Sequence, residues 1–329
     1  MSPVDGLLVL DKPAGCTSHD VVARCRRIYA QKKVGHAGTL DPDATGVLLV
    51  GLGQATRLLQ YLSGLPKRYT GEVVLGVATS TLDAGGSVTG RWDMSGVSVE
   101  AAKKAALSLT GEITQIPPMV SALKVGGRRL HELARAGIEV ERAARAVTVS
   151  RFDVELADVA GGRSTGSVGT PGLAGSGSRG GASSAGGAGP VLAIDVVCSS
   201  GTYVRTLAAD LGAALGGGAH LRRLRRLAVG SYGVEESVRL DALEAALEPA
   251  QMVLGPLEAL RGMARLTVTG EMAGAVAHGQ VMPLGALRER GGAGPGPWAV
   301  LSAEGMLLAV YEVHGPQGAK PAVVLSRCR

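Results

Sequence analysis

Aromatic residues and cysteines are scarce in this chain of 329 residues. Their scarcity argues against a core built on aromatic rings, a disulfide-rich protein and a cysteine-ligated metal site. Only 3% of the residues are aromatic, so the core must consist mainly of Val, Leu and Ala, which a hydrophobic share of 46% allows. The four cysteines form no CxxC pair and no Cys/His spacing typical of a metal site. They predict reduced thiols of a cytosolic protein rather than disulfides. These cysteines are Cys16, Cys25, Cys198 and Cys328.

Long apolar runs and a basic-then-apolar leader are also missing. No stretch is long enough to span a bilayer, so we expect a soluble, cytoplasmic protein with no membrane partner. The chain does carry an excess of positive charge, +6 at pH 7, with Lys and Arg in clusters. Clustered basic residues favour a polyanionic partner, nucleic acid before membrane, and the alternative is a mildly basic solvated surface.

One loop concentrates residue types that catalysis needs. Residues 34–46 (VGHAGTLDPDATG) place three glycines, a proline and two threonines around Asp41, and the apolar run 47–50 predicts a buried strand directly after them. A carboxylate held on a tight loop beside a core is a candidate nucleophile or general base. The alternative is an aspartate that only binds loop amides, since Asp is common in turns.

The hydrophobic pattern predicts an α+β organisation. Strands are expected at 6–10, 47–50, 67–76, 147–156 and 191–198. Helices are expected at 18–29, 56–62, 99–109, 128–136, 204–215, 240–247 and 252–260.

Two regions differ in composition from the rest of the chain. Between residues 161 and 190, twelve of the thirty positions are Gly, which predicts a disordered insertion in a surface loop. From residue 261 onward short strands dominate, at 298–302, 307–313 and 322–325. We therefore expect one domain over 1–260 and a small β-rich domain over 261–329.

Basic residues gather in two segments. Arg24, Arg26, Arg27, Lys32 and Lys33 lead into the Asp41 loop, and they predict either a solvated helix face or a ridge that contacts phosphates. Residues 219–227 (AHLRRLRRL) are the most basic run in the chain. They predict either an amphipathic helix turn with a solvated face or contact with a phosphate backbone.

Two further residues are candidates for a binding site. Arg205 follows a predicted strand and opens a predicted helix, where it is well placed to pair with a loop carboxylate. Tyr69, next to Lys67 and Arg68, is usually a core residue in such a position, but it is also a candidate platform for stacking on a base.

Motifs in sequence order resemble the TruB family, the tRNA pseudouridine-55 synthases. The matching segments are 10–15 (LDKPAG), 17–20 (TSHD), 35–42 (GHAGTLDP), 44–46 (ATG), 67–69 (KRY), 117–118 (PP), 121–124 (SALK), 201–206 (GTYVRT) and 218–226 (GAHLRRLRR). The resemblance implies a pseudouridine synthase catalytic domain, with a mixed, mostly antiparallel central sheet flanked by helices, and a PUA-like RNA-binding domain. It implies isomerisation of uridine to pseudouridine at position 55 in the T-loop of tRNA. No cofactor or metal is implied, and a monomer is expected.

The resemblance also implies roles for individual residues. Asp41 matches the catalytic aspartate, Arg205 the arginine that pairs with it, and Tyr69 the aromatic residue that stacks on the target uracil. His36 matches the residue that is wedged into the tRNA loop when bases flip out. Further positions of the substrate site are Tyr203, Leu224 and Lys12. The chain departs from the family at Val120, where Tyr is common, so one aromatic wall of the site is expected to be thinner.

Two other interpretations of Asp41 remain. Residues 41–45 (DPDAT) fit the DxDxT pattern of Mg²⁺-dependent phosphatases with an aspartate nucleophile. Those enzymes need a hydrophobic strand directly before the first Asp, whereas residues 35–39 are expected to form a loop. The second alternative is an RNA-binding protein without catalytic activity, in which Asp41 is structural.

Overall fold

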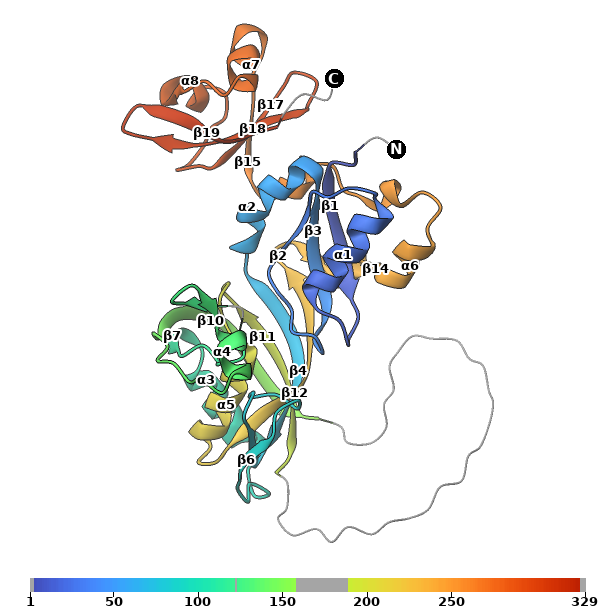
Figure 1. Cartoon of the computed structure of the whole chain (residues 1–329). Coiled ribbons are helices and arrows are strands. Elements are labelled where there is room, and N and C mark those ends of the chain that lie inside the picture. Colours follow the sequence, from blue (N-terminus) through green and yellow to red (C-terminus); the bar gives the residue numbers. More distant parts are fainter. Residues whose placement is uncertain (1–2, 122, 158–188, 326–329) are drawn as a thin grey trace. The chain divides into compact units, whose positions relative to one another are not determined.

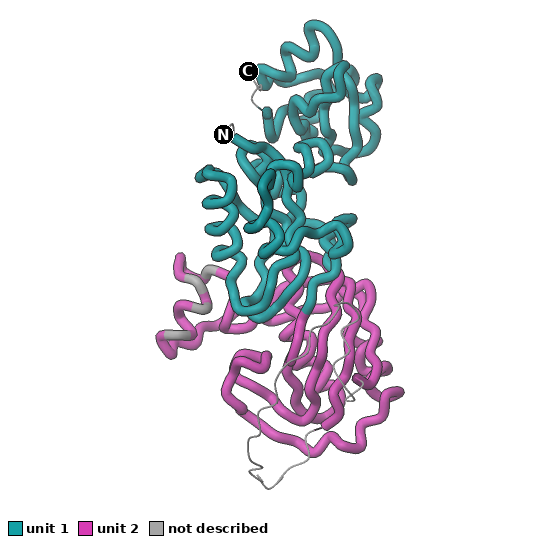
Figure 2. The backbone as a smooth tube through the Cα atoms, turned by 90° about the vertical axis from the view of Figure 1, so that its right-hand side faces the viewer, with its two compact units in different colours: residues 1–67, 225–329 teal, residues 68–224 magenta. Residues whose placement is uncertain are grey.

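The structure, a computed structural model, describes residues 3–121, 123–157 and 189–325. Residues 1–67 and 225–329 form one compact unit, and residues 68–224 form a second (Figure 2). The insertion expected at 161–190 lies outside the described residues except for Gly189 and Pro190. The backbones of these two residues are hydrogen-bonded to the backbone of Leu75.

The first unit draws its elements from both ends of the chain. Its strands before residue 261 are β1 (Gly6–Lys12), β2 (Val34–Ala37), β3 (Thr45–Leu52), β13 (Tyr232–Gly233) and β14 (Val238–Arg239). Its helices there are α1 (Ser18–Ile28), α2 (Leu59–Ser63), α6 (Leu240–Ala245) and the 3₁₀ helices η1 (Gly53–Leu58), η2 (Val234–Glu236), η3 (Pro249–Met252) and η4 (Glu258–Leu260).

Strands β1 and β3 form the centre of this unit, and they pair antiparallel along their whole length. Successive side chains of a strand point to opposite faces. Leu7 and Val9 therefore pack in a cluster with η1 and α2, whereas Leu8 and Leu10 pack in a cluster with α1 and α6. Figure 1 shows these helices on the two sides of the strands. Burial on both faces explains why the strands are continuous apolar runs in the sequence.

The second unit contains most of the remaining sheet. Its strands are β4 (Lys67–Leu75), which begins at the last residue of the first unit, β5 (Val77–Thr79), β6 (Val88–Arg91), β7 (Gly111–Gln115), β8 (Lys124–Val125), β9 (Arg128–Arg129), β10 (Arg145–Leu156) and β11 (Val191–Cys198). Its helices are α3 (Val99–Ser108), α4 (Leu130–Arg135) and α5 (Val204–Ala214). Strand β12 (Ala219–Val229) begins in this unit and ends in the first.

The strand order within each unit confirms the expected fold class. In the first unit the order is β14-β1-β3-β12, and in the second it is β12-β4-β11-β10-β7. Pairing is antiparallel for β1 with β3 and for β10 with both β7 and β11, and parallel for β12 with β3 and for β1 with β14. The sheet is therefore mixed and mostly antiparallel, and helices flank it, as predicted.

Two local expectations and one of the alternatives are wrong. Residues 219–227 form part of strand β12, which excludes the helix-turn alternative, because Arg225 and Arg226 pair with β3 despite the leucine spacing of three. Residues 252–260 form no α-helix and contain only the end of η3 and the short η4. Residues 34–37, expected as loop, form strand β2, which pairs with β3.

Residues beyond 261 form a separate five-stranded sheet in the order β15-β17-β18-β19-β16. Its elements are β15 (Ala264–Thr267), α7 (Gly270–Ala277), β16 (Met282–Pro283), α8 (Leu284–Arg288), β17 (Trp298–Leu301), β18 (Leu307–His314) and β19 (Gly318–Val324). Trp298 and Tyr311 are fully buried in its core, so two of the few aromatic rings are used here. The small β-rich part is thus confirmed, and the boundary at residue 261 stays a prediction.

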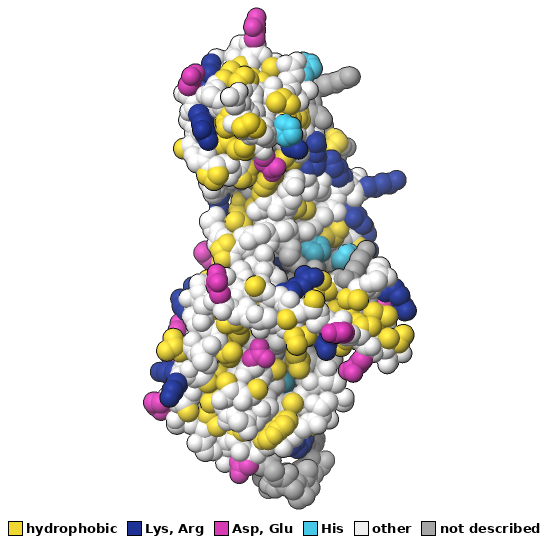
Figure 3. Space-filling view, turned by 90° about the vertical axis from the view of Figure 1, so that its left-hand side faces the viewer, with side chains coloured by type: hydrophobic (Ala, Val, Ile, Leu, Met, Phe, Trp, Pro, Cys, Tyr) yellow, Lys and Arg dark blue, Asp and Glu magenta, His cyan; other side chains and the backbone are white. Residues whose placement is uncertain are grey.

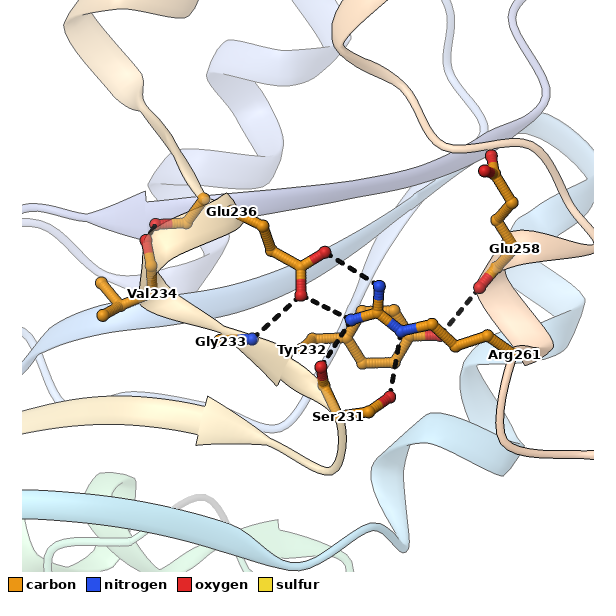
Figure 4. A network of polar contacts seen from close by, with 8 residues as sticks. Ser231, Tyr232, Gly233, Val234, Glu236, Glu258 and Arg261 are labelled. Carbon is orange, nitrogen blue, oxygen red and sulfur yellow. Dashed lines mark hydrogen bonds and ion pairs between the residues drawn. The ribbon is translucent and has the colours of Figure 1, made fainter.

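Arg261, at the start of this part, is fixed by a network of polar contacts (Figure 4). Its guanidinium forms an ion pair with Glu236, donates to the backbone and side chain of Ser231, and lies 4.0 Å above the ring of Tyr232. Hydrogen bonding from Arg261 holds the pKa of the Glu236 carboxyl below its ordinary value. The network ties the segment before β15 to the β12–β13 turn.

Candidate active site

Asp41 lies on the loop that joins β2 to β3 in the first unit. The two strands pair antiparallel up to Ala37 and Leu49, so residues 38–44 form the connection at the end of a hairpin. Gly38 and Gly46 have φ angles of +88° and +103°, a backbone region in which side chains other than hydrogen are strained. The two glycines therefore allow the turns on either side of Asp41, whose side chain is half-buried.

Leu40, directly before Asp41, is held by a buried serine. Its backbone N–H donates to the Oγ of Ser18 at 2.9 Å, and the same hydroxyl donates to the carbonyl oxygen of Leu40 at 3.2 Å. Ser18 is the first residue of α1, and Thr17 caps that helix in a reciprocal capping box with Asp20. The capped helix end thus positions one neighbour of Asp41.

Lys12 holds the part of the loop that follows Asp41. Its Nζ donates to the carbonyl oxygens of Pro13, Pro42 and Ala44 at 2.8, 2.9 and 2.7 Å. The side chain is fully buried, and burial lowers the pKa of its ammonium group, although the charge of Asp41 is among those that oppose this shift. All three donors of the ammonium group are satisfied by loop carbonyls, so Lys12 organises the backbone after Asp41.

His36, on β2, presents a half-buried ring next to this loop. Its ring meets that of His19 edge to face, with centroids 5.3 Å apart. Among the residues that the structure describes, none offers a hydrogen bond to its Nδ1. Burial, followed by the charges of His19 and Arg226, lowers the pKa of His36 to about 4. The imidazole is therefore neutral at pH 7.

Arg205, in the second unit, is buried at the start of α5. Its guanidinium donates to the carbonyl oxygens of Thr81 at 3.0 Å and Val120 at 2.8 Å, and lies 3.4 Å from a carboxylate oxygen of Asp83. Because the bond at position 120 uses the backbone, the replacement of the family's usual Tyr by Val leaves it intact. Asp83 did not emerge from the sequence, where it lies in a polar loop without a recognisable motif.

Asp83 is itself held in one orientation. The hydroxyl of Thr81 donates to its carboxylate at 2.5 Å, and the backbone N–H of Gly85 donates at 3.1 Å. Leu82, between these partners, has a φ of +62°, which is uncommon for a residue with a branched side chain. The loop therefore places an oriented carboxylate against Arg205.

Tyr69 and Leu224 lie on neighbouring strands of the second unit, β4 and β12. Gly71 permits a close approach of these strands, because a Cβ there would lie 2.6 Å from the carbonyl oxygen of Arg223. Tyr69 is 8% exposed. Tyr203, which precedes α5, is positioned through its backbone N–H, which donates to the side chain of Gln115 at 3.0 Å. The structure thus places four predicted residues in this unit, and Lys12, His36 and Asp41 in the first.

The arginines of β12 divide into paired surface residues and one buried residue. Arg222 and Arg223 share Glu72, and Arg225 forms a two-pronged pair with Asp11 at 2.7 and 3.0 Å. Figure 3 shows basic and acidic side chains together on the surface that it displays. Arg226 is only 1% exposed. The four arginines of β12 are therefore not equally exposed to a phosphate backbone.

Comparison with known proteins identifies the family. The profile of the TruB family pseudouridylate synthase N-terminal domain matches residues 26–163, and that of the tRNA pseudouridylate synthase B C-terminal domain matches residues 205–261. The chain belongs to the TruB family. It is therefore an enzyme, a pseudouridylate synthase, rather than a phosphatase or an RNA-binding protein alone.

Similarity to other TruB proteins extends over almost the whole chain. A protein named tRNA pseudouridine synthase B from Mycobacterium sp. (strain KMS) is 42% identical over 320 residues, which cover 97% of this chain and 96% of that protein. The protein of the same name from Leifsonia xyli subsp. xyli (strain CTCB07) is 42% identical over 318 residues, 95% of this chain and 94% of that protein.

A solved structure shares the fold. One chain of a Cbf5–Nop10–Gar1 complex superposes with a TM-score of 0.67 at 23% identity, over 97% of this chain and 84% of that one. Within the part of the TruB chain that the structure describes, no group of three or more His, Cys, Asp or Glu residues is placed to hold a metal ion. In the same residues, no helix is both long and apolar enough to cross a membrane.

Proposed function

We propose that this enzyme isomerises the uridine at position 55 in the T-loop of tRNA, with Asp41 as the catalytic carboxylate and without a cofactor. The relatives that carry the name tRNA pseudouridine synthase B support the substrate. The observation that carries the catalytic assignment is the loop itself, in which buried side chains hold the backbone before and after Asp41. Such preorganisation keeps a reactive group in position without reorganisation during the reaction.

The reaction requires one carboxylate and no redox step. The N1–C1′ glycosidic bond breaks, the uracil turns, and a C5–C1′ bond forms in its place, while C5 loses its proton and N1 gains one, so the product is an isomer of the substrate. Asp41 can serve either by covalent attack on the substrate or by removing a proton from the ribose, and both routes begin from an ionised carboxylate. A buried carboxylate needs a counter-charge. In this proposal Arg205 pairs with Asp41, and Asp83 keeps the guanidinium oriented.

The remaining residues bind the substrate. The target uridine is extruded from the folded T-loop, at a cost of a few kcal/mol. Tyr69 stacks on the flipped uracil, with Tyr203 and Leu224 beside it in the pocket, because flipped bases are held by stacking and by contacts to their polar edges. His36 inserts into the vacated position of the tRNA loop. A neutral, half-buried imidazole suits this role, since it loses little hydration when it stacks.

Two domains with different roles are proposed for the chain. Residues 1–260 are the catalytic domain and residues 261–329 a PUA-like RNA-binding domain, and the enzyme acts as a cytoplasmic monomer on the T-arm of tRNA. Lys12 contributes from beneath the site through its bonds to the loop carbonyls.

Mapping of the product tests the proposed function. The full-length protein is incubated with an unmodified tRNA transcript, and pseudouridine is mapped by position. A matched transcript carries cytidine in place of the T-loop uridine. We expect one pseudouridine, at position 55, in the first transcript and none in the second. Modification of other uridines in both transcripts, or of none in either, would refute the assignment of the substrate site.

A further inference from the structure

The buried arginine of β12 has no role in the proposal so far. We propose that Arg226 is a positioning residue that fixes the loop carrying Asp41, and does not contact RNA phosphates. This inference rests on the proposed function of Asp41. Arg226 is the last arginine of the basic run, and its side chain is only 1% exposed. Arg226 and the residues that it contacts all belong to the first unit.

The guanidinium of Arg226 joins the two ends of the loop. Its Nη2 donates to the carbonyl oxygen of Gly38 at 3.0 Å, and its Nη1 lies 3.5 Å from that of Thr39. Its Nε donates to the carbonyl oxygen of Val47 at 2.6 Å, on the far side of Asp41. A buried charge is tolerated where its donors are satisfied, and here the carbonyls that satisfy them belong to the loop and the strand it enters.

The backbone of Arg226 fixes the same loop a second time. Arg226 lies opposite Gly46 in the parallel pairing of β12 with β3. A Cβ on Gly46 would lie 2.1 Å from the carbonyl oxygen of Arg226, so only glycine permits this approach. One residue therefore contacts the loop before Asp41 with its side chain and after Asp41 with both side chain and backbone.

Lysine could not replace this arginine. The guanidinium is a planar group whose five N–H bonds diverge in a fixed fork, whereas an ammonium group is a compact charge at the end of a flexible stem. Lys12 already supplies an ammonium group to the carbonyls of Pro42 and Ala44. Only the fork spans from Gly38 to Val47.

Arg223 provides the matched control. It lies three residues away on the same strand, but its side chain is 78% exposed and its nearest acidic partner, Glu72, is 3.7 Å away. Arg226→Lys and Arg223→Lys thus make the same chemical change at a buried and at an exposed site. Each full-length variant is compared with the wild type for its single-turnover rate on tRNA at saturating enzyme, its Kd for tRNA, and hydrogen exchange of the loop amides.

We expect Arg226→Lys to lower the single-turnover rate by about tenfold or more, with a Kd for tRNA within about twofold of the wild type. The backbone amides of Leu40 and Ala44, which are hydrogen-bonded inside the loop, should exchange faster. Arg223→Lys should change neither the rate nor the exchange. A merely structural role would not separate rate from affinity in this way.

Several results would overturn the inference. Unchanged exchange of the loop amides in Arg226→Lys, or faster exchange with an unchanged rate, would contradict it, as would a weaker Kd with a normal rate. If Arg226→Lys does not fold, hydrogen exchange of the wild-type protein still tests whether the loop is anchored. The amides of Leu40 and Ala44 should then exchange as slowly as those of β3, and exchange as fast as in the exposed turn at Gly126 would refute the anchoring. A wild-type protein that forms no pseudouridine would refute the proposed function, and the exchange measurement would still show whether Arg226 holds the loop.

Discussion

Two regions of the molecule, the Asp41 loop and the exposed part of β12, each involve a pair of cations, but the two pairs lie in opposite environments. At the loop, Lys12 and Arg226 are buried and donate to backbone carbonyl oxygens of the loop. On β12, the side chains of Arg222 and Arg223 are 42% and 78% exposed and share Glu72. Burial, rather than residue type, separates a cation that shapes a loop from one that is accessible to RNA.

The two arrangements also differ in strength. A hydrogen bond to a charged group contributes about 1.5–3 kcal/mol, and a buried carbonyl left without its donor costs about 1–3 kcal/mol. An exposed ion pair contributes about 0–1 kcal/mol. Changes at the buried cations should therefore affect the rate, and changes at the exposed ones should affect the salt dependence of binding.

Among the buried cations, the largest effect on the rate is expected at Arg205, an arginine of the second unit. Arg205→Lys keeps the charge but loses the fork that reaches Thr81, Val120 and Asp83. We expect the single-turnover rate to fall about a hundredfold, equivalent to about 2.7 kcal/mol, with an unchanged slope of log Kd against log salt. A lower salt slope with a normal rate would instead identify Arg205 as a phosphate contact.

The burial of His36 should make the stability of the protein depend on pH. The pKa of this histidine is about 4 in the folded protein and near 6.5 when unfolded, so the unfolded chain binds more protons between these values. Stability should then decrease as the pH falls from 7 to 5. We expect His36→Gln to remove about 1–2 kcal/mol of this decrease, measured by urea unfolding at both pH values. His278→Gln, at an exposed histidine, is the control, and equal pH dependence of wild type and His36→Gln would disprove the burial effect.

The exposed arginines should have smaller, purely electrostatic effects. If Arg222 contacts a phosphate, Arg222→Ala should lower the salt slope of tRNA binding by up to about one. The rate at saturating enzyme should stay unchanged, and binding should weaken equally for every tRNA sequence, because phosphates carry no sequence information. Binding measured at several salt concentrations checks this, and a rate defect would place Arg222 in the chemistry.

Deletion of the glycine-rich segment should have the smallest effect. Strands β10 and β11 pair antiparallel up to Leu156 and Leu192, so a short connection can join them. Removing residues 161–187 keeps Gly189 and Pro190 on Leu75, and loop closure depends only weakly on length. We expect the melting temperature and rate to match those of the full chain. A large drop in either would show that the segment packs against the protein.

The sequence predicts the elements whose pattern is local. Continuous apolar runs identify β1 and β3, and the helix expected at 18–29 forms as α1. The loop around Asp41 is recognisable because glycine and proline are needed where the backbone turns sharply. These features depend on neighbours in sequence, which is why they can be read without a structure.

The remaining features depend on contacts distant in sequence. The leucines of 219–227 have a spacing of three, and only pairing with β3 and β4 makes the segment a strand. Arg226 was indistinguishable from Arg222 and Arg223 by composition, since its partners lie about 180 residues away. Asp83 was missed for the same reason, because its partner Arg205 lies far along the chain.

In the proposed function, Asp41 performs the chemistry on a loop whose backbone is held by Ser18, Lys12 and Arg226. The most direct test is Asp41→Asn, measured for single-turnover formation of pseudouridine in an unmodified tRNA transcript and for Kd with the same transcript. We predict a rate below about a hundredth of the wild type, about 2.7 kcal/mol in the barrier, with the Kd within about tenfold, or about 1.4 kcal/mol. Turnover above that level with a normal Kd would contradict the claim.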